Sequence, residues 1–348
     1  MAGMSRMDRR RQEEAKKQVS NDKKSNIEKH TTPTPPTNQG IPQKKKRKKK
    51  KSWLFWLLMI LVAIIALSAV GYAKGYFTAK ADKNNKEFEM SAFHGQKSQD
   101  DSINVLLLGS DSRGEDQGRS DSIMIAHYNK KTKQPQIVSI MRDTFVAIPT
   151  QDGIEYNKIN AAYSYGGPEM VRQTIENNFG VSIQYYAVVN FDSFPKIIDV
   201  LAPRGLPITA EKDLEVEGTV IKKGQTNLTG HEALQYARFR KDEEGDFGRV
   251  RRQQQVMSAI TKQATNPLHA WKLPEMLGAV VGYTQTDVPV TTYLSVGSSY
   301  VFSSHKSLEI LTVPVEGSWN DGYYDYAGSV LEINEEMNKQ AIQKFFSK

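Results

Sequence analysis

Short apolar runs separated by polar segments fill the chain from about residue 102 to its end. Runs rich in branched residues predict buried strands at 103–108, 122–128, 136–141, 184–190 and 308–313. Apolar positions at helical spacing predict helices at 168–178, 191–201, 233–240, 270–283, 290–303 and 333–346. Because strands alternate with helices, we expect one α/β domain with a central, mostly buried β-sheet flanked by helices. The Gly- and Pro-rich segment 203–226 predicts a loop or hairpin over this sheet, and the Tyr-rich segment 319–326 predicts a loop.

One stretch before the domain is apolar throughout and predicts a transmembrane helix. Residues 53–73 carry no charge, and 21 residues at about 1.5 Å each span roughly 30 Å, the thickness of a bilayer core. Trp53, Trp56, Tyr72 and Tyr76 place aromatic rings near both interfaces. A cleaved signal peptide fits less well, because the run is long and no small-residue cleavage site follows it. A buried helix of a soluble protein is the remaining alternative.

The positive charge of the chain is concentrated before this stretch. The net charge is +8, yet residues 1–51 contain 17 basic and 5 acidic residues, so the remainder carries a small acidic excess. Residues 44–51 are eight consecutive Lys or Arg, which suit a cytoplasmic flank in contact with anionic lipid. The folded part has no basic excess, and we therefore expect no nucleic-acid partner. The chain has no cysteine, which excludes disulfides and thiolate chemistry.

These patterns predict four segments. They are a disordered basic cytoplasmic tail at 1–51, a transmembrane helix at 52–74, an extracellular stalk at 75–101 and an extracellular domain at 102–348. The protein is then a single-pass protein of the cell membrane, with its N-terminus in the cytoplasm.

The first two predicted strands flank a polar loop that contains acidic and basic residues. Asp111 and Asp121 lie in this region together with Arg113 and Arg119. Mg²⁺ prefers oxygen ligands and is held by one or two carboxylates plus substrate phosphates, while arginines bind the remaining phosphate oxygens. A solvated loop with surface ion pairs is the alternative.

A second group of charges follows a predicted helix. Thr229 and Glu232 form a capping box, and the helix that they begin ends near Arg238 and Arg240. Six basic residues fall within positions 238–252. If residues 249–253 are helical, Arg249, Arg252 and Gln253 share one face and Arg251 points elsewhere. A surface ion-pair network with Asp242, Glu243, Glu244 and Asp246 is the alternative to an anion site.

Several motifs, in order, resemble those of the LytR-CpsA-Psr family. They are LLLGSDSR at 106–113, RSDSI at 119–123, SIMRDT at 139–144, KINAA at 158–162, ARFRK at 237–241 and DFGRVRRQ at 246–253. The resemblance covers about residues 102–262, and the short tail with a single span also matches. Met141 stands where the family often has proline.

The resemblance implies the chemistry and assigns residues to it. Asp111 and Asp121 would bind Mg²⁺ or Mn²⁺, and a hydrophobic tunnel would hold a prenyl chain. The pyrophosphate would be bound by Arg119, Arg142, Arg238, Arg240, Arg249, Arg252 and Gln253. Arg142, Asp121 and Asp246 are the expected catalytic residues, with either aspartate accepting the proton of the attacking hydroxyl.

The function so implied is a phosphotransferase that moves a glycopolymer, such as wall teichoic acid or capsule, from an undecaprenyl-pyrophosphate carrier to peptidoglycan. The alternatives are a hydrolase acting on the same lipid pyrophosphate, a cell-envelope regulator and a wall-binding module without chemistry.

Overall fold

The computed structural model describes residues 50–83, 85, 92–110, 118–301 and 306–348. The chain divides into two units, Met1–Trp56 and Leu57–Lys348, and every strand described belongs to the second. The helices are α2 (Lys50–Ala81), α3 (Ala161–Phe179), α4 (Phe194–Leu201), α5 (Gly230–Arg238), α6 (Gly245–Ala264), the 3₁₀ helix η1 (Pro267–Lys272), α7 (Leu273–Tyr283), α8 (Val290–Val301) and α9 (Glu335–Phe346). The strands are β1 (Ile103–Ser110), β2 (Ser120–Asn129), β3 (Gln134–Ile140), β4 (Thr144–Thr150), β5 (Gly153–Lys158), β6 (Tyr185–Asn190), β7 (Leu206–Ala210), β8 (Leu214–Val216), β9 (Thr219–Ile221), β10 (Gly224–Leu228), β11 (Gln285–Thr286), β12 (Glu309–Val313), β13 (Trp319–Tyr324) and β14 (Gly328–Ile333).

Helix α2 is long and apolar enough to cross a membrane over Trp53–Ala81. It continues past residue 74, where the predicted span ends, so the first part of the predicted stalk is helical. Farther along that stalk, the amide of Gln96 donates to the carbonyl of Ile183, 2.7 Å away, and Phe93 packs against Tyr186. The segment predicted as a stalk is therefore partly joined to the domain.

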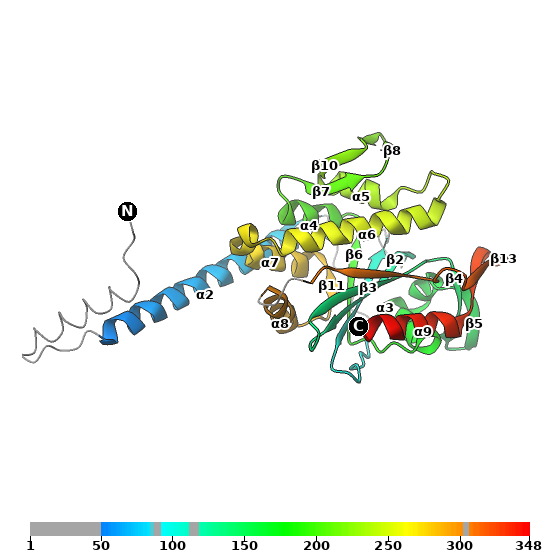
Figure 1. Cartoon of the computed structure of the whole chain (residues 1–348), viewed down its shortest axis with the longest axis horizontal. Coiled ribbons are helices and arrows are strands. Elements are labelled where there is room, and N and C mark those ends of the chain that lie inside the picture. The colour runs from blue at the N-terminus through cyan, green and yellow to red at the C-terminus, as the bar shows by residue number, and fades with distance from the viewer. Residues whose placement is uncertain (1–49, 84, 86–91, 111–117, 302–305) are drawn as a thin grey trace, which may run out of the picture. The chain divides into compact units, whose positions relative to one another are not determined.

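A six-stranded mixed sheet forms the centre of the domain, as the sequence predicts. Its order is β11-β6-β1-β2-β3-β12, in which β1 and β6 are parallel, as are β3 and β12. Helices α3 and α9 cover one face, and α4, α5 and α6 lie over the other (Figure 1). The main core lies between the sheet and α3, and Leu106, Ile125 and Ile175 are fully buried there. The predicted fold class, an α/β sheet flanked by helices, is confirmed.

A second, four-stranded sheet has the order β13-β14-β4-β5, and several of its strands were not expected. The Tyr-rich segment predicted as a loop contains strand β13, which pairs with β14 over its whole length. The loop prediction is wrong because aromatic residues favour strands when they pack on a sheet. Here Tyr324 stacks on Phe145 of β4, with ring centroids 4.6 Å apart.

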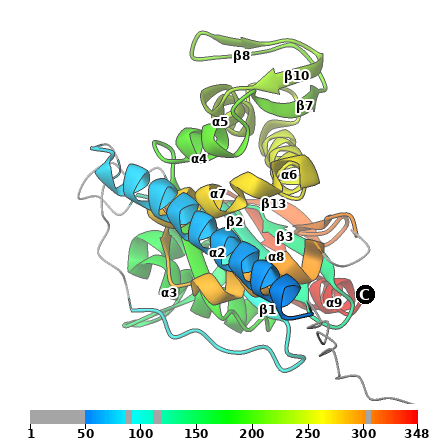
Figure 2. The same ribbon diagram turned by 90° about the vertical axis from the view of Figure 1, so that its left-hand side faces the viewer.

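The Gly- and Pro-rich segment 203–226 folds into two hairpin pairs, β7 with β10 and β8 with β9. They do not lie over the central sheet. Instead they share a second core with α4, α5 and α6, in which Leu206, Leu228 and Tyr236 are buried. Figure 2 shows these hairpins beyond α5 and α6, away from β1 and β2.

Helix α3 begins earlier than predicted. It starts at Ala161, and a kink at Gly166 and Gly167 precedes Pro168, where the sequence predicts its start. It ends at Phe179, one residue beyond the predicted end. Gly180 then adopts a left-handed conformation with φ of 67°, and its amide donates to the carbonyl of Glu176.

His127 on β2 predicts an acid-sensitive fold. It is buried, stacks on Phe346 and shares a 2.7 Å hydrogen bond with Asn104. Burial lowers its pKa to about 4, and Asp100 only partly opposes this effect. The unfolded chain therefore binds the proton first, and stability falls as the pH drops from about 6.5 towards 4. In detergent, His127→Gln should flatten the dependence of the melting temperature on pH in this window. Equal slopes in the variant and the wild type would contradict this account.

Candidate functional site

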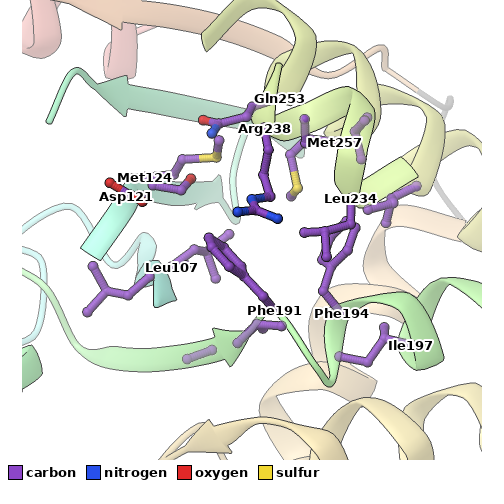
Figure 3. Close-up of a pocket in the computed structure, with 18 of the residues that line it drawn as sticks. Leu107, Asp121, Met124, Phe191, Phe194, Ile197, Leu234, Arg238, Gln253 and Met257 are labelled. Carbon is purple, nitrogen blue, oxygen red and sulfur yellow. The ribbon is translucent and has the colours of Figure 1, made fainter. Parts of the chain in front are cut away.

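A cavity of about 430 Å³ lies between the central sheet and helices α4, α5, α6, α7 and α8. Its charged lining residues and one amide come from positions far apart in the chain: Asp121, Arg142, Arg238, Arg240, Arg249 and Gln253. Figure 3 shows Asp121, Arg238 and Gln253 among the lining side chains. The rest of the lining is mostly apolar and includes Leu107, Met124, Phe191, Phe194, Ile197, Leu234, Met257, Ile260 and Val280. A large apolar pocket with a few convergent charges is the usual form of a ligand site.

The polar and apolar groups occupy different parts of this cavity. Along α6, Arg249 and Gln253 come first, and Val256, Met257 and Ile260 follow on later turns of the same helix. Strands β1 and β2 also place polar before apolar lining. The pair Gly109 and Ser122 lies next to Asp121, and the pair Leu107 and Met124 lies two residues farther from Asp121 along the two strands. The cavity is therefore shaped for an amphiphile with an anionic group at one end and an apolar chain at the other.

Arg142 lies at the centre of the polar end, two residues after the end of strand β3. Its Nη1 donates to Asp121 at 2.7 Å, and its Nε lies 3.5 Å from Asp143 and 3.7 Å from Asp246. Asp246 is also ion-paired with Arg249 at 2.7 Å, and Asp143 with Lys158 at 3.1 Å. One network of charges thus joins strand β2, the corner between β3 and β4, and helix α6.

Burial and neighbouring charges shift the pKa values in this network. Burial opposes the charge on Arg142, but Asp121, Asp143 and Asp246 outweigh it and raise the pKa of Arg142. Burial raises the pKa of Asp246 despite Arg249 and Arg142, and Asp143 and Asp121 add to the rise. Burial also lowers the pKa of Arg249, although Asp246 opposes it. In the described part of the chain, both carboxylate oxygens of Asp246 and the Nε atoms of Arg142 and Arg249 are buried without a hydrogen bond. These atoms are suited to a polar ligand.

Arg238 and Arg240 reach the cavity because of how helix α5 begins and ends. The capping box predicted from Thr229 and Glu232 is present, and the helix ends at Arg238, its ninth residue. The Arg238 guanidinium lies 5.0 Å from the centre of the Phe191 ring and 3.6 Å from Glu217. Figure 3 shows it pointing between Gln253 and Phe191.

Four residues predicted for the site are not found in the cavity lining. One of them, Asp246, adjoins the lining through its ion pair with Arg249. Arg252 is buried on another side of α6, where it donates to Asp242 at 2.9 Å and to the carbonyl of Phe239 at 3.0 Å. Successive helix positions turn by about 100°, so Arg252 lies only about 60° around the helix from Arg249. The predicted shared face is therefore present, but the packing of α6 turns Arg252 towards Asp242 and Phe239 and not towards the cavity. Arg119 is exposed and is not among the lining residues. Asp111 lies outside the described residues, as does Arg113.

Other residues lie at the site although the sequence did not predict them there. Asp143 and Lys158 carry charges next to Arg142, and both belong to quoted motifs, so their sequence signal was available. The apolar lining gave no signal, because an apolar helix face has the same pattern over a core as over a ligand.

The polar end can bind phosphate oxygens, since guanidinium groups match them bidentately and stay charged. A divalent cation would need oxygens from such a ligand as well. Among the described residues there is no group of three or more His, Cys, Asp or Glu arranged to hold a metal. Asp121 nevertheless fits the usual Mg²⁺ arrangement, in which one or two carboxylates and substrate phosphates share the ion.

Comparison with known proteins gives consistent matches. The sequence model of the LytR_cpsA_psr family matches residues 67–342. "Regulatory protein MsrR" of Staphylococcus aureus strain COL is 43% identical over 279 residues, which cover 80% of this chain and 82% of that protein. "Polyisoprenyl-teichoic acid–peptidoglycan teichoic acid transferase TagU" of Bacillus anthracis strain CDC 684 is 35% identical over 240 residues, 68% of this chain and 76% of that one. The crystal structure of B. subtilis TagV superposes with a TM-score of 0.63 at 28% identity, covering 72% of this chain and 97% of TagV.

The placement of Arg252 predicts that it stabilises the fold. Arg252→Leu removes a buried charge from Asp242 and should cost about 3 kcal/mol, seen as a melting temperature lower by several degrees. The matched control is Arg251→Leu on the same helix, because Arg251 is exposed and pairs with Glu211 and Glu244. The control should change stability by less than about 1 kcal/mol. Equal losses in the two variants, measured by thermal unfolding in detergent, would refute the assignment.

Proposed function

The chain belongs to the LytR_cpsA_psr family, and from that premise we propose that it is a membrane-anchored transferase of cell-wall glycopolymers. The donor is a polyprenyl-pyrophosphate-linked glycopolymer such as wall teichoic acid, and the acceptor is peptidoglycan. The printed name of the TagU relative supports both substrates. The excess of basic residues before α2 supports a cytoplasmic N-terminus and an extracellular domain.

The single observation that supports this proposal best is the division of the cavity into a polar and an apolar part. A prenyl pyrophosphate has the same division, with a doubly phosphorylated end and a hydrocarbon chain. Arg142, Arg238 and Arg249 would bind the phosphates, and the residues beyond Met257 on α6 would contact the chain. Neither a solvated ion-pair network nor a wall-binding module requires the apolar part.

The reaction is the attack of a muramyl hydroxyl oxygen on the sugar-linked phosphorus. One oxygen–phosphorus bond forms, the bond from that phosphorus to the bridging oxygen breaks, and prenyl phosphate leaves. Arginines around the phosphates offset the charge that develops on the bridging and non-bridging oxygens. The hydroxyl proton passes to a carboxylate, and we assign this role to Asp246 in preference to Asp121. Asp246 has a raised pKa, and apart from the ion pairs of its Oδ1 with Arg249 and Arg142 it makes no hydrogen bond within the described residues. Asp121 accepts a hydrogen bond from Arg142 and is the expected metal ligand.

Mg²⁺ or Mn²⁺ is the expected cofactor, bound by Asp121 and Asp111 together with phosphate oxygens of the donor. When bound, it would neutralise charge on the pyrophosphate. Asp121 would then do two things: it would orient Arg142 through one oxygen and leave the other for the ion.

The transfer itself can be tested with purified full-length protein and a labelled lipid-linked polymer, with and without peptidoglycan. We expect a polymer–peptidoglycan conjugate that forms about 100-fold more slowly in Asp246→Asn. Arg251→Gln, a change on the same helix outside the cavity, should leave the rate unchanged. Free polymer formed equally well without peptidoglycan would identify a hydrolase instead, and no turnover in either case would favour a regulator.

The cofactor can be tested separately. Chelation with EDTA should abolish transfer, and added Mg²⁺ or Mn²⁺ should restore it, because the pyrophosphate charge is otherwise only partly neutralised. Asp121→Asn should need a higher cation concentration for half-maximal rate, with an unchanged melting temperature. Full activity in the presence of EDTA would exclude the metal.

A further inference from the structure

The last turns of α2 are packed tightly against helix α7. At Gly75 and Gly278, a Cβ atom would collide with backbone atoms of the opposite helix, and at Gly282 it would meet Ala79 and the backbone of Tyr76. Figures 1 and 2 both show α7 beside the end of α2 that adjoins the domain. Only residues without a Cβ allow helix backbones to come this close.

Polar contacts fix this pair of helices in place. Lys74 forms a 2.8 Å ion pair with Glu275, and Asp82 pairs with Lys196 and accepts from the Tyr283 hydroxyl. Asn85 donates to the carbonyls of Ala79 and Gly282 at 2.9 and 2.8 Å. The last turns of α2 and the residues that follow them are therefore held to α7 and to α4 by several polar contacts.

The two helices run in the same direction, which sets the level of α7 relative to a bilayer. Gly71 is nearest Pro274, Gly75 nearest Glu275, and Ala79 nearest Gly282. A bilayer core of about 30 Å accommodates roughly 20 residues of helix. Counted from Trp53, the core ends near Tyr72, so the first turn of α7 lies at the level of the membrane boundary.

The 3₁₀ helix η1 immediately precedes this first turn and approaches it from the membrane side. Two of its large apolar side chains are among the most exposed in the described chain: Leu268 is 78% exposed and Trp271 is 75% exposed. The Lys272 ammonium lies 5.1 Å from the Trp271 ring. Tryptophan with an adjacent lysine is the composition that favours a membrane–water interface.

We propose that η1 is a membrane-contact element, in which Leu268 and Trp271 insert into the interfacial region of the phospholipid leaflet around the end of α2. A phospholipid surface is the partner because α2 itself places η1 at that depth. A protein partner would have to displace lipid from the same position.

This contact also orients the cavity. Helix α6 leads from Arg249 through Ile260 to its end at Ala264, and η1 begins three residues later. Val280, on the helix that packs against α2, lines the apolar part of the cavity. The apolar part therefore faces the membrane and the arginines face away from it. If the proposed function holds, the hydrocarbon chain of the donor enters from the leaflet beside η1.

The absence of cysteine from the chain makes a direct test possible. Leu268→Cys and Trp271→Cys are labelled separately with a nitroxide in full-length protein in phospholipid nanodiscs. Ile154→Cys is the matched control, because Ile154 is 71% exposed and β5 lies on the side of the domain away from α2. Circular dichroism and thermal melting confirm that each labelled protein is folded.

We expect labels at 268 and 271 to collide more often with oxygen, which partitions into lipid, than with a water-soluble nickel chelate. The label at 154 should show the reverse. Labels at 268 and 271 that are as accessible to the chelate as the label at 154 would overturn the proposal. The accessibility measurement needs no turnover, so it tests the membrane contact independently of the transferase function.

A second measurement uses the double variant Leu268→Ser, Trp271→Ser. With donor embedded in the nanodisc, KM should rise about tenfold from the loss of apolar contact. With a short-chain, water-soluble donor, kcat and KM should match those of the wild type. An equal loss with both donors would show that these residues support the fold and not the membrane contact.

Discussion

The cluster of carboxylates around Arg142 is the interaction on which the site depends. Asp121 from β2, Asp143 beside Arg142 and Asp246 from α6 all lie within 4 Å of one guanidinium. Removing such charges from water costs several kcal/mol per ion, so a buried cluster of this kind is weak evidence for stability. The cluster does hold Arg142, Arg249 and Asp246 in place before any ligand arrives. Such preorganised charge is what phosphoryl transfer requires.

The two parts of the cavity are built by the same elements, and this couples recognition of the charged group to recognition of the chain. Helix α6 carries Arg249 at its beginning and Ile260 three turns later, so one rigid element spans both parts. Helix α7 continues the apolar part and packs against α2 through Gly278 and Gly282. A ligand that fills the cavity therefore contacts elements that are joined both to the central sheet and to the apolar helix α2.

Much of the fold could be predicted because local patterns dominate it. The neighbouring residues alone predict the buried strand at 103–108, the strand at 308–313 and the capping box at Thr229. The strand at 308–313 is present but only half-buried, because burial depends on what packs against it. Strands β13 and β14 were missed, since their stability comes from pairing with each other and with β4. A short aromatic segment does not encode in its own sequence whether such a partner will be available.

The sequence by itself determined the apolar span, the α/β class and the identity of the charged residues that could bind phosphate. The tertiary structure decided which of those charges meet. Arg249 and Arg252 are three positions apart in the same motif, yet Arg249 lines the cavity and Arg252 pairs with Asp242 in the interior. The physical reason is that helix geometry fixes only the angle between two side chains, whereas the packing of the helix determines what lies in each direction.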